Sequence, residues 1–87
     1  MTLNELSLNE ICYIKELNSS GDVRRRMLDM GLIPGTQLES VFKAPFGEPT
    51  AYLIRGTLIA LRDSDAEKIV IEPDMRQTDV KGMNINE

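Results

Sequence analysis

The chain has 87 residues, enough for one small domain, and a domain of this size buries only about 60% of the surface that its unfolded chain exposes. Its 10 basic and 14 acidic side chains give a net charge of −4, so it lacks the excess of Lys and Arg that broad nucleic-acid binding needs. Histidine is absent, which removes the usual acid–base group at neutral pH and the commonest metal ligand. These features predict a protein that is not an enzyme and does not bind nucleic acid.

The predicted location is the cytoplasm. Cys12 is the one cysteine, so no disulfide can form within the chain, which fits a reducing compartment. The first ten residues are polar and do not resemble a secretory leader. The apolar runs fall far short of the roughly 20 residues that span a bilayer.

The N-terminal third predicts a polar lead-in, a strand and a helix. Residues 1–9 are expected to be held to the core by Leu3 and Leu6. Residues 10–18 are rich in β-branched and aromatic types and predict a strand, with a bulge or two covered faces because its alternation is imperfect. Residues 19–31 predict a short helix that is capped by a serine at its start and ended by a glycine.

The rest of the chain predicts short strands. They are expected at 36–43, 50–54, 57–62 and 69–71. A proline-rich loop, 44–49, follows the first of these, and Arg55-Gly56 joins the next two by a bulge or a turn. Residues 63–68 predict a turn of helix, in which Ser64 and Glu67 have the spacing of a capping box.

The expected fold class is therefore mainly β: a small barrel of about five strands with one short α-helix. Residues 1–72 are assigned to this domain. Residues 73–87 are polar and without hydrophobic period, and they predict a C-terminal tail with no stable structure of its own.

Several motifs together resemble the ferrous-iron transport protein A (FeoA) family. The longest is the segment 21–36, GDVRRRMLDMGLIPGT, and APFGEP at 44–49 is a second. Arg55-Gly56 followed by ALR at 60–62, and AEKI at 66–69, complete the match over most of residues 1–72. The resemblance implies an SH3-like barrel that needs no cofactor.

The resemblance also implies a function. It points to a non-enzymatic accessory protein of bacterial ferrous-iron uptake that binds the FeoB permease, at its GTPase region or near the membrane. Such a protein contacts the membrane only through the permease. The formation of homo-oligomers is left as an open question. The alternative is a transition-metal-binding or sensing module, because iron-dependent repressors carry the same barrel and fold alone does not settle function.

Candidate partner-binding residues come from the helix and the proline-rich loop. Three adjacent arginines could contact an acidic partner or form a solvated face beside Asp22 and Asp29. The apolar side chains of the helix and its end, Met27, Met30 and Leu32, could lie in the core or form a docking patch. The aromatic side chain of the loop, Phe46, could be an exposed anchor or could be buried. The candidates are Arg24, Arg25, Arg26, Met27, Met30, Leu32, Pro45 and Phe46. No catalytic or metal-binding residue is predicted, and Cys12 is expected to be a buried apolar side chain.

Overall fold

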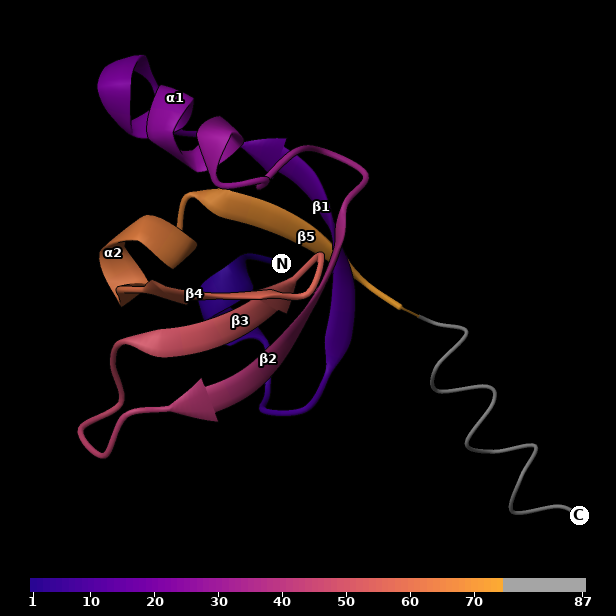
Figure 1. Cartoon of the computed structure of the whole chain (residues 1–87), viewed down its shortest axis with the longest axis vertical. Coiled ribbons are helices and arrows are strands. Elements are labelled where there is room, and N and C mark those ends of the chain that lie inside the picture. The colour runs from indigo at the N-terminus through magenta and orange to yellow at the C-terminus, as the bar shows by residue number, and fades with distance from the viewer. Residues whose placement is uncertain (75–87) are drawn as a thin grey trace, which may run out of the picture.

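A computed structural model describes residues 1–74 of the chain. Most of the predicted polar tail, 75–87, lies outside the described residues. Two α-helices and a 3₁₀ turn accompany five strands (Figure 1). The strands are β1 (Ile11–Leu17), β2 (Gln37–Lys43), β3 (Thr50–Ile54), β4 (Thr57–Leu61) and β5 (Ile69–Pro73). The helical elements are η1 (Leu3–Glu5), α1 (Gly21–Asp29) and α2 (Asp63–Ala66). Each predicted strand and helix is present, with ends that shift by one or two residues.

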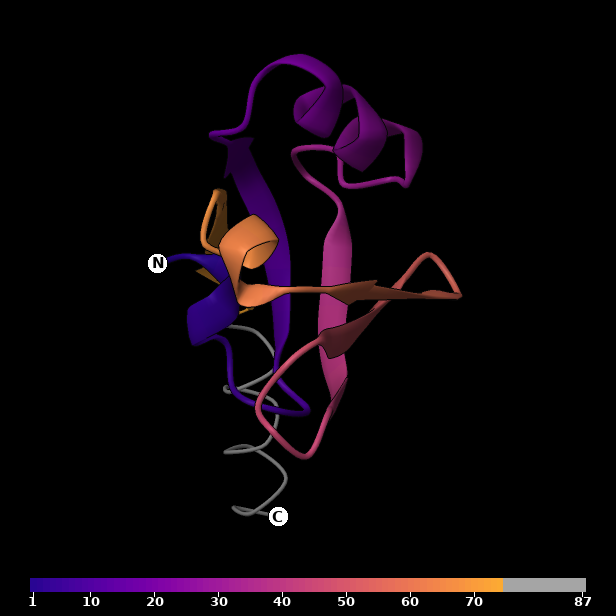
Figure 2. The same cartoon turned by 90° about the vertical axis from the view of Figure 1, so that its left-hand side faces the viewer.

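The five strands form one antiparallel sheet in the order β4-β3-β2-β1-β5. Figure 2 shows the β3–β4 hairpin crossing β1 and β2, so the sheet curls around its own inner face. Two irregularities in register help it to bend: one in β1 between Ile14 and Glu16, and one in β2 between Ser40 and Phe42. The first is a bulge, one of the two alternatives that the imperfect alternation of residues 10–18 left open.

The core fills the inside of this curled sheet. Alternate residues of the strands point inward, as the period of two in a strand requires. The residues buried most completely include Leu3, Cys12, Ile14, Leu38, Ile54 and Ile69. Leu3 and Leu6 are both buried, so the predicted anchoring of the N-terminal segment is confirmed. Because this small core is filled by side chains, we expect the binding sites of the protein on its surface.

Helix α1 connects β1 to β2 and ends as predicted. Gly31 has a φ of 98°, a left-handed conformation that glycine adopts without strain. Its N–H donates to the Leu28 carbonyl at 3.0 Å, and the N–H of Leu32 donates to the Met27 carbonyl at 3.0 Å. These two bonds are the Schellman arrangement. At the other end Ser20 occupies the N-cap position without a side-chain hydrogen bond to the helix.

The connections around β4 resolve two open points. Arg55 and Gly56 have φ values of 52° and 81°, so both residues adopt the left-handed backbone conformation. They form a two-residue hairpin turn rather than a bulge. The predicted capping box at Ser64 and Glu67 is wrong, because α2 starts two residues earlier, with Arg62 as its N-cap. The first N–H of α2, on Asp63, donates instead to Oε1 of Glu48 at 3.0 Å.

The two edges of the sheet differ. The β5 edge is covered by the start of the chain, because Thr2 forms a bridge with Val70 and the N–H of Ile71 donates to the Met1 carbonyl at 2.9 Å. The other edge, β4, pairs only with β3 among residues 1–74. Within those residues no helix is long and apolar enough to cross a membrane.

Candidate interaction surface

The predicted partner-binding residues lie at two opposite ends of the molecule. Figures 1 and 2 show α1 at one end and the loop between β2 and β3, residues 44–49, at the other. The structure therefore does not bring the helix candidates and the loop candidates together. A single flat partner surface would meet one group or the other.

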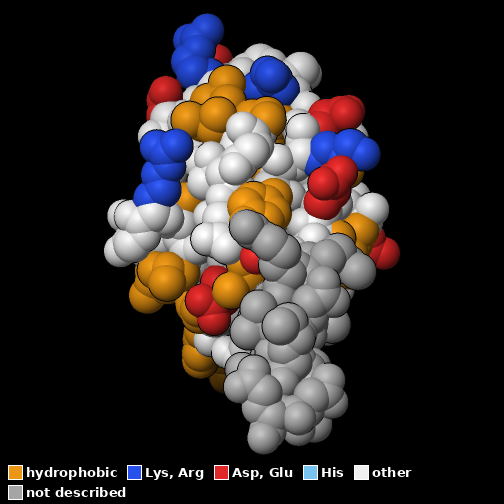
Figure 3. All heavy atoms as spheres, turned by 90° about the vertical axis from the view of Figure 1, so that its right-hand side faces the viewer, with side chains coloured by type: hydrophobic (Ala, Val, Ile, Leu, Met, Phe, Trp, Pro, Cys, Tyr) orange, Lys and Arg blue, Asp and Glu red, His pale blue; other side chains and the backbone are white. Residues whose placement is uncertain are grey.

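The three arginines of α1 are all exposed, yet they differ in their contacts. Nη1 of Arg24 donates to the Leu17 carbonyl at 3.0 Å, which ties the helix to the end of β1. Arg25 and Arg26 form no ion pair with a described residue, and neither do Asp22 and Asp29. The helix thus presents two free guanidinium groups, and Figure 3 shows basic side chains at the end of the molecule where α1 lies.

Two of the candidate docking residues are core residues instead. Met27 is 2% exposed and Leu32 is fully buried, so neither side chain offers surface to a partner. Leu32 is inward because the Schellman ending folds it back beneath the last turn of α1, and Met27 is the residue by which α1 itself enters the core. Met30 is partly buried against the same core. Val23, one turn before Met27 on the same helix, is exposed.

The loop candidates are exposed. The Phe46 side chain is 99% exposed, and Pro45 beside it is exposed as well. The N–H of Gly47 donates to the Ala44 carbonyl at 2.8 Å, which closes a tight turn and directs residues 45 and 46 outward. The loop is further held at its base by the Glu48 bond to α2. Phe46 is thus an apolar side chain at the tip of a fixed loop.

The sequence did not single out an apolar region on the outer face of the sheet. Phe42 is 59% exposed and Leu58 is 64% exposed. Figure 3 shows hydrophobic side chains at the lower left of the molecule, with acidic side-chain atoms among them, and others near its top. In the run TLIAL at 57–61, apolar residues occupy both the odd and the even positions. The sequence pattern therefore does not show which of these side chains point inward and which point outward.

Cys12 and the carboxylates of residues 1–74 are too dispersed for a metal site. Among the described residues, no three His, Cys, Asp or Glu side chains gather where they could hold a metal ion. The Cys12 side chain is fully buried. Loss of solvation raises the pKa of this thiol to about 12, with a smaller contribution from the charge of Glu10. Since metals bind the thiolate, the free thiol is a poor ligand at neutral pH.

Comparisons with known proteins agree with the geometry. The FeoA domain family model matches residues 1–73. An Fe(2+) transport protein A/Fe(2+) transporter FeoB fusion protein of Porphyromonas gingivalis is 35% identical over 72 residues, 83% of this chain but only 8% of the relative. The solution structure of a FeoA protein from Chlorobium tepidum is 32% identical, with a TM-score of 0.79 over 84% of this chain and 70% of that one.

A third relative adds the fold name. The crystal structure of FeoA from Stenotrophomonas maltophilia in complex with zinc is described as a prokaryotic SH3 domain protein; it is 32% identical, with a TM-score of 0.70 over 83% of this chain and 89% of that one. The curled five-stranded sheet with its inserted helix is therefore an SH3-like barrel. With the family match across nearly all of the described residues, the chain belongs to the FeoA family.

Proposed function

We propose that this protein is a non-enzymatic accessory protein of ferrous-iron uptake that binds a FeoB-type permease on its cytoplasmic side. The observation that carries the proposal is the fusion relative, in which a region like this chain and a FeoB transporter form one polypeptide. Fusion places two modules at a high effective concentration, which is useful when they act on each other. The chain corresponds to 8% of that relative, so the transport activity belongs to the permease part.

The surface that we assign to this contact is the solvent face of α1. Arg25 and Arg26 are exposed and free of ion pairs within residues 1–74, so they remain available to carboxylates of a partner. Arg24 holds the helix to β1 and positions them. The loop at Pro45 and Phe46 lies at the opposite end, and it is assigned to a separate contact rather than to this one.

The alternative, a metal-binding or metal-sensing module, has less support from the described residues. Their acidic groups are dispersed and their one thiol is buried with a raised pKa. A saturable Fe(II), Mn(II) or Zn(II) site in calorimetry, lost on removal of carboxylates, would favour it over the permease-binding proposal.

Binding to the purified cytoplasmic GTPase domain of the permease from the same organism tests the proposal. The domain is presented without nucleotide, with GDP and with a non-hydrolysable GTP analogue. We expect binding in at least one state, weakened roughly tenfold in an Arg25→Ala/Arg26→Ala variant. A Lys43→Ala/Arg62→Ala variant removes the same charge away from α1 and is expected to bind as the wild type does.

Two results would contradict the proposal at different levels. Absence of binding in every nucleotide state would contradict the permease contact itself. Equal weakening by both double variants would keep the contact but remove α1 from it, because the effect would then come from net charge.

A further inference from the structure

The outer face of β2, β3 and β4 is an apolar surface that the proposed permease contact does not use. The strand registers place its residues side by side, because paired residues in an antiparallel sheet lie on the same face. Two rows result: Ile11–Glu39–Leu53–Leu58 and Phe42–Ala51–Ala60. The residues between these rows, such as Ser40 and Tyr52, are buried, so the two rows face outward.

This face is too apolar for an ordinary solvated sheet surface. Apart from Glu39, every member of the two rows is apolar, and Phe42 and Leu58 are more than half exposed. A water-facing sheet side usually alternates to polar residues. A contiguous apolar surface on a small protein marks an interaction site.

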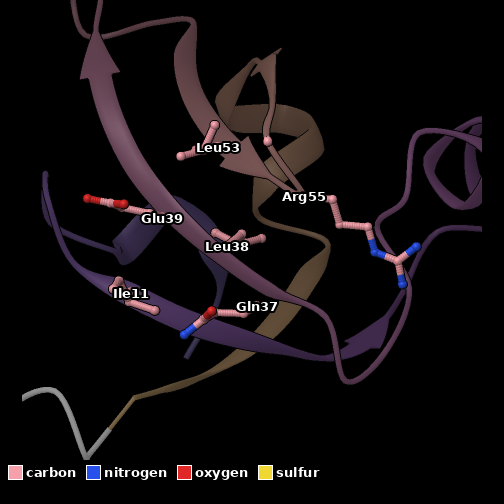
Figure 4. Close-up of a pocket in the computed structure, with 7 residues that line it drawn as sticks. Ile11, Gln37, Leu38, Glu39, Leu53 and Arg55 are labelled. Atoms are coloured by element: carbon pink, nitrogen blue, oxygen red, sulfur yellow. The ribbon is translucent and has the colours of Figure 1, made fainter.

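A shallow pocket of about 240 Å³ lies across this face, and two opposite charges flank it. Its lining includes Glu39 on β2, Leu53 on β3 and Arg55 at the tip of the β3–β4 hairpin. Figure 4 shows the Glu39 and Arg55 side chains pointing to opposite sides, and Leu53 of the outward row is among the apolar residues that line the pocket. Neither forms an ion pair with any of residues 1–74. The face therefore carries one free carboxylate and one free guanidinium on opposite sides of an apolar centre.

We propose that this outer sheet face binds a second copy of the chain in a symmetric, face-to-face dimer. A two-fold axis lying in the interface would bring Glu39 of each copy to Arg55 of the other, so both free charges would be paired twice. The same operation would place the apolar rows of one copy against those of the other. A partner of one charge sign would leave either Glu39 or Arg55 unpaired, whereas an identical copy satisfies both.

The contact is small, and the dimer is accordingly expected to be weak. One face of three short strands is at the lower end of the areas that specific interfaces bury. The dimer should therefore form in the range of about ten to several hundred micromolar, the affinity typical of transient contacts. Because α1 lies away from this face, dimer formation and the proposed permease contact can be measured separately.

Sedimentation equilibrium of the full chain, from about 10 μM to 1 mM, tests the proposal. We expect a monomer–dimer equilibrium in the wild type and at least a tenfold weaker one in Leu58→Glu, which puts a charge into the apolar row. Val23→Glu is the matched control: it also replaces an exposed aliphatic side chain by a carboxylate, but on α1, and it should dimerise like the wild type.

Charge reversal tests the predicted pairing itself. Glu39→Arg and Arg55→Asp should each weaken the dimer, because like charges then meet, and the double variant should recover it. Aspartate suits position 55, where φ is 52°. A wild type that stays monomeric at 1 mM overturns the proposal, and so does a double variant no stronger than the single ones. Thermal unfolding of every variant separates loss of association from loss of fold.

Discussion

Burial controls the chemistry of the one thiol in the chain. Folding raises the pKa of Cys12 from 9.0 to about 12, chiefly because the thiolate would lose its solvation. The native state therefore favours the neutral thiol. The resulting stabilisation is fully present below about pH 9 and is lost as the pH rises from there toward 12.

This gives a prediction for the Cys12→Ala variant. The free energy of unfolding of the wild type should fall faster with pH than that of the variant between pH 8 and pH 10.5, because the thiol of the unfolded wild type ionises in this range while the buried thiol of the native state stays protonated. Denaturant unfolding at several pH values measures the difference, and Tyr and Lys titrations cancel because both proteins contain them. A folded protein whose thiol reacts with a maleimide at pH 8 as fast as free cysteine would contradict the burial.

Single residues also mark the limit of what the sequence could predict about the surface. Gly31 was interpretable in advance because a left-handed backbone has few compatible residue types, whereas Arg55-Gly56 was left open between a bulge and a turn. Met27 and Leu32 were left open between core and docking patch, since an apolar side chain near a helix end suits both. The position of the barrel beneath α1 decides the matter, and a local sequence pattern does not contain it.

At the level of elements, the five strands and the two α-helices of residues 1–74 could be predicted, while the 3₁₀ turn η1 and the N-terminal cap of α2 could not. The pattern Ser64-x-x-Glu67 fits a capping box, yet α2 begins at Asp63 and its first N–H bonds to Glu48, fifteen residues earlier in the chain. A local pattern cannot reveal an acceptor that arrives from another loop. The same bond connects the loop 44–49 to α2.

The capping of α2 leads to a prediction with a built-in comparison. Glu48→Ala should lower the free energy of unfolding by about 0.5–2 kcal/mol, the usual cost of losing a helix N-terminal acceptor. Glu48→Gln keeps an oxygen in place and should cost less. Ser64→Ala should change stability by less than about 0.5 kcal/mol, because its hydroxyl caps nothing. Urea unfolding curves measure all three, and a larger loss for Ser64→Ala than for Glu48→Ala would contradict the assignment.

At the scale of the whole molecule, the N-terminal segment completes the barrel. Leu3 is fully buried and sits on η1, and Thr2 pairs with Val70 along the β5 edge. The segment thus contributes to the core and covers a sheet edge at the same time. In a domain this small, few other residues can replace either contribution.

Leu3→Ala should therefore destabilise the whole protein rather than loosen one end. We expect a loss of about 2–5 kcal/mol, as for other buried leucines, out of a total stability of about 5–15 kcal/mol for a domain. Leu8→Ala, which shortens a leucine that is 46% exposed, should cost less than about 0.5 kcal/mol. Denaturant unfolding followed by circular dichroism gives both values. Equal effects of the two substitutions would show that residues 1–6 are not part of the cooperative core.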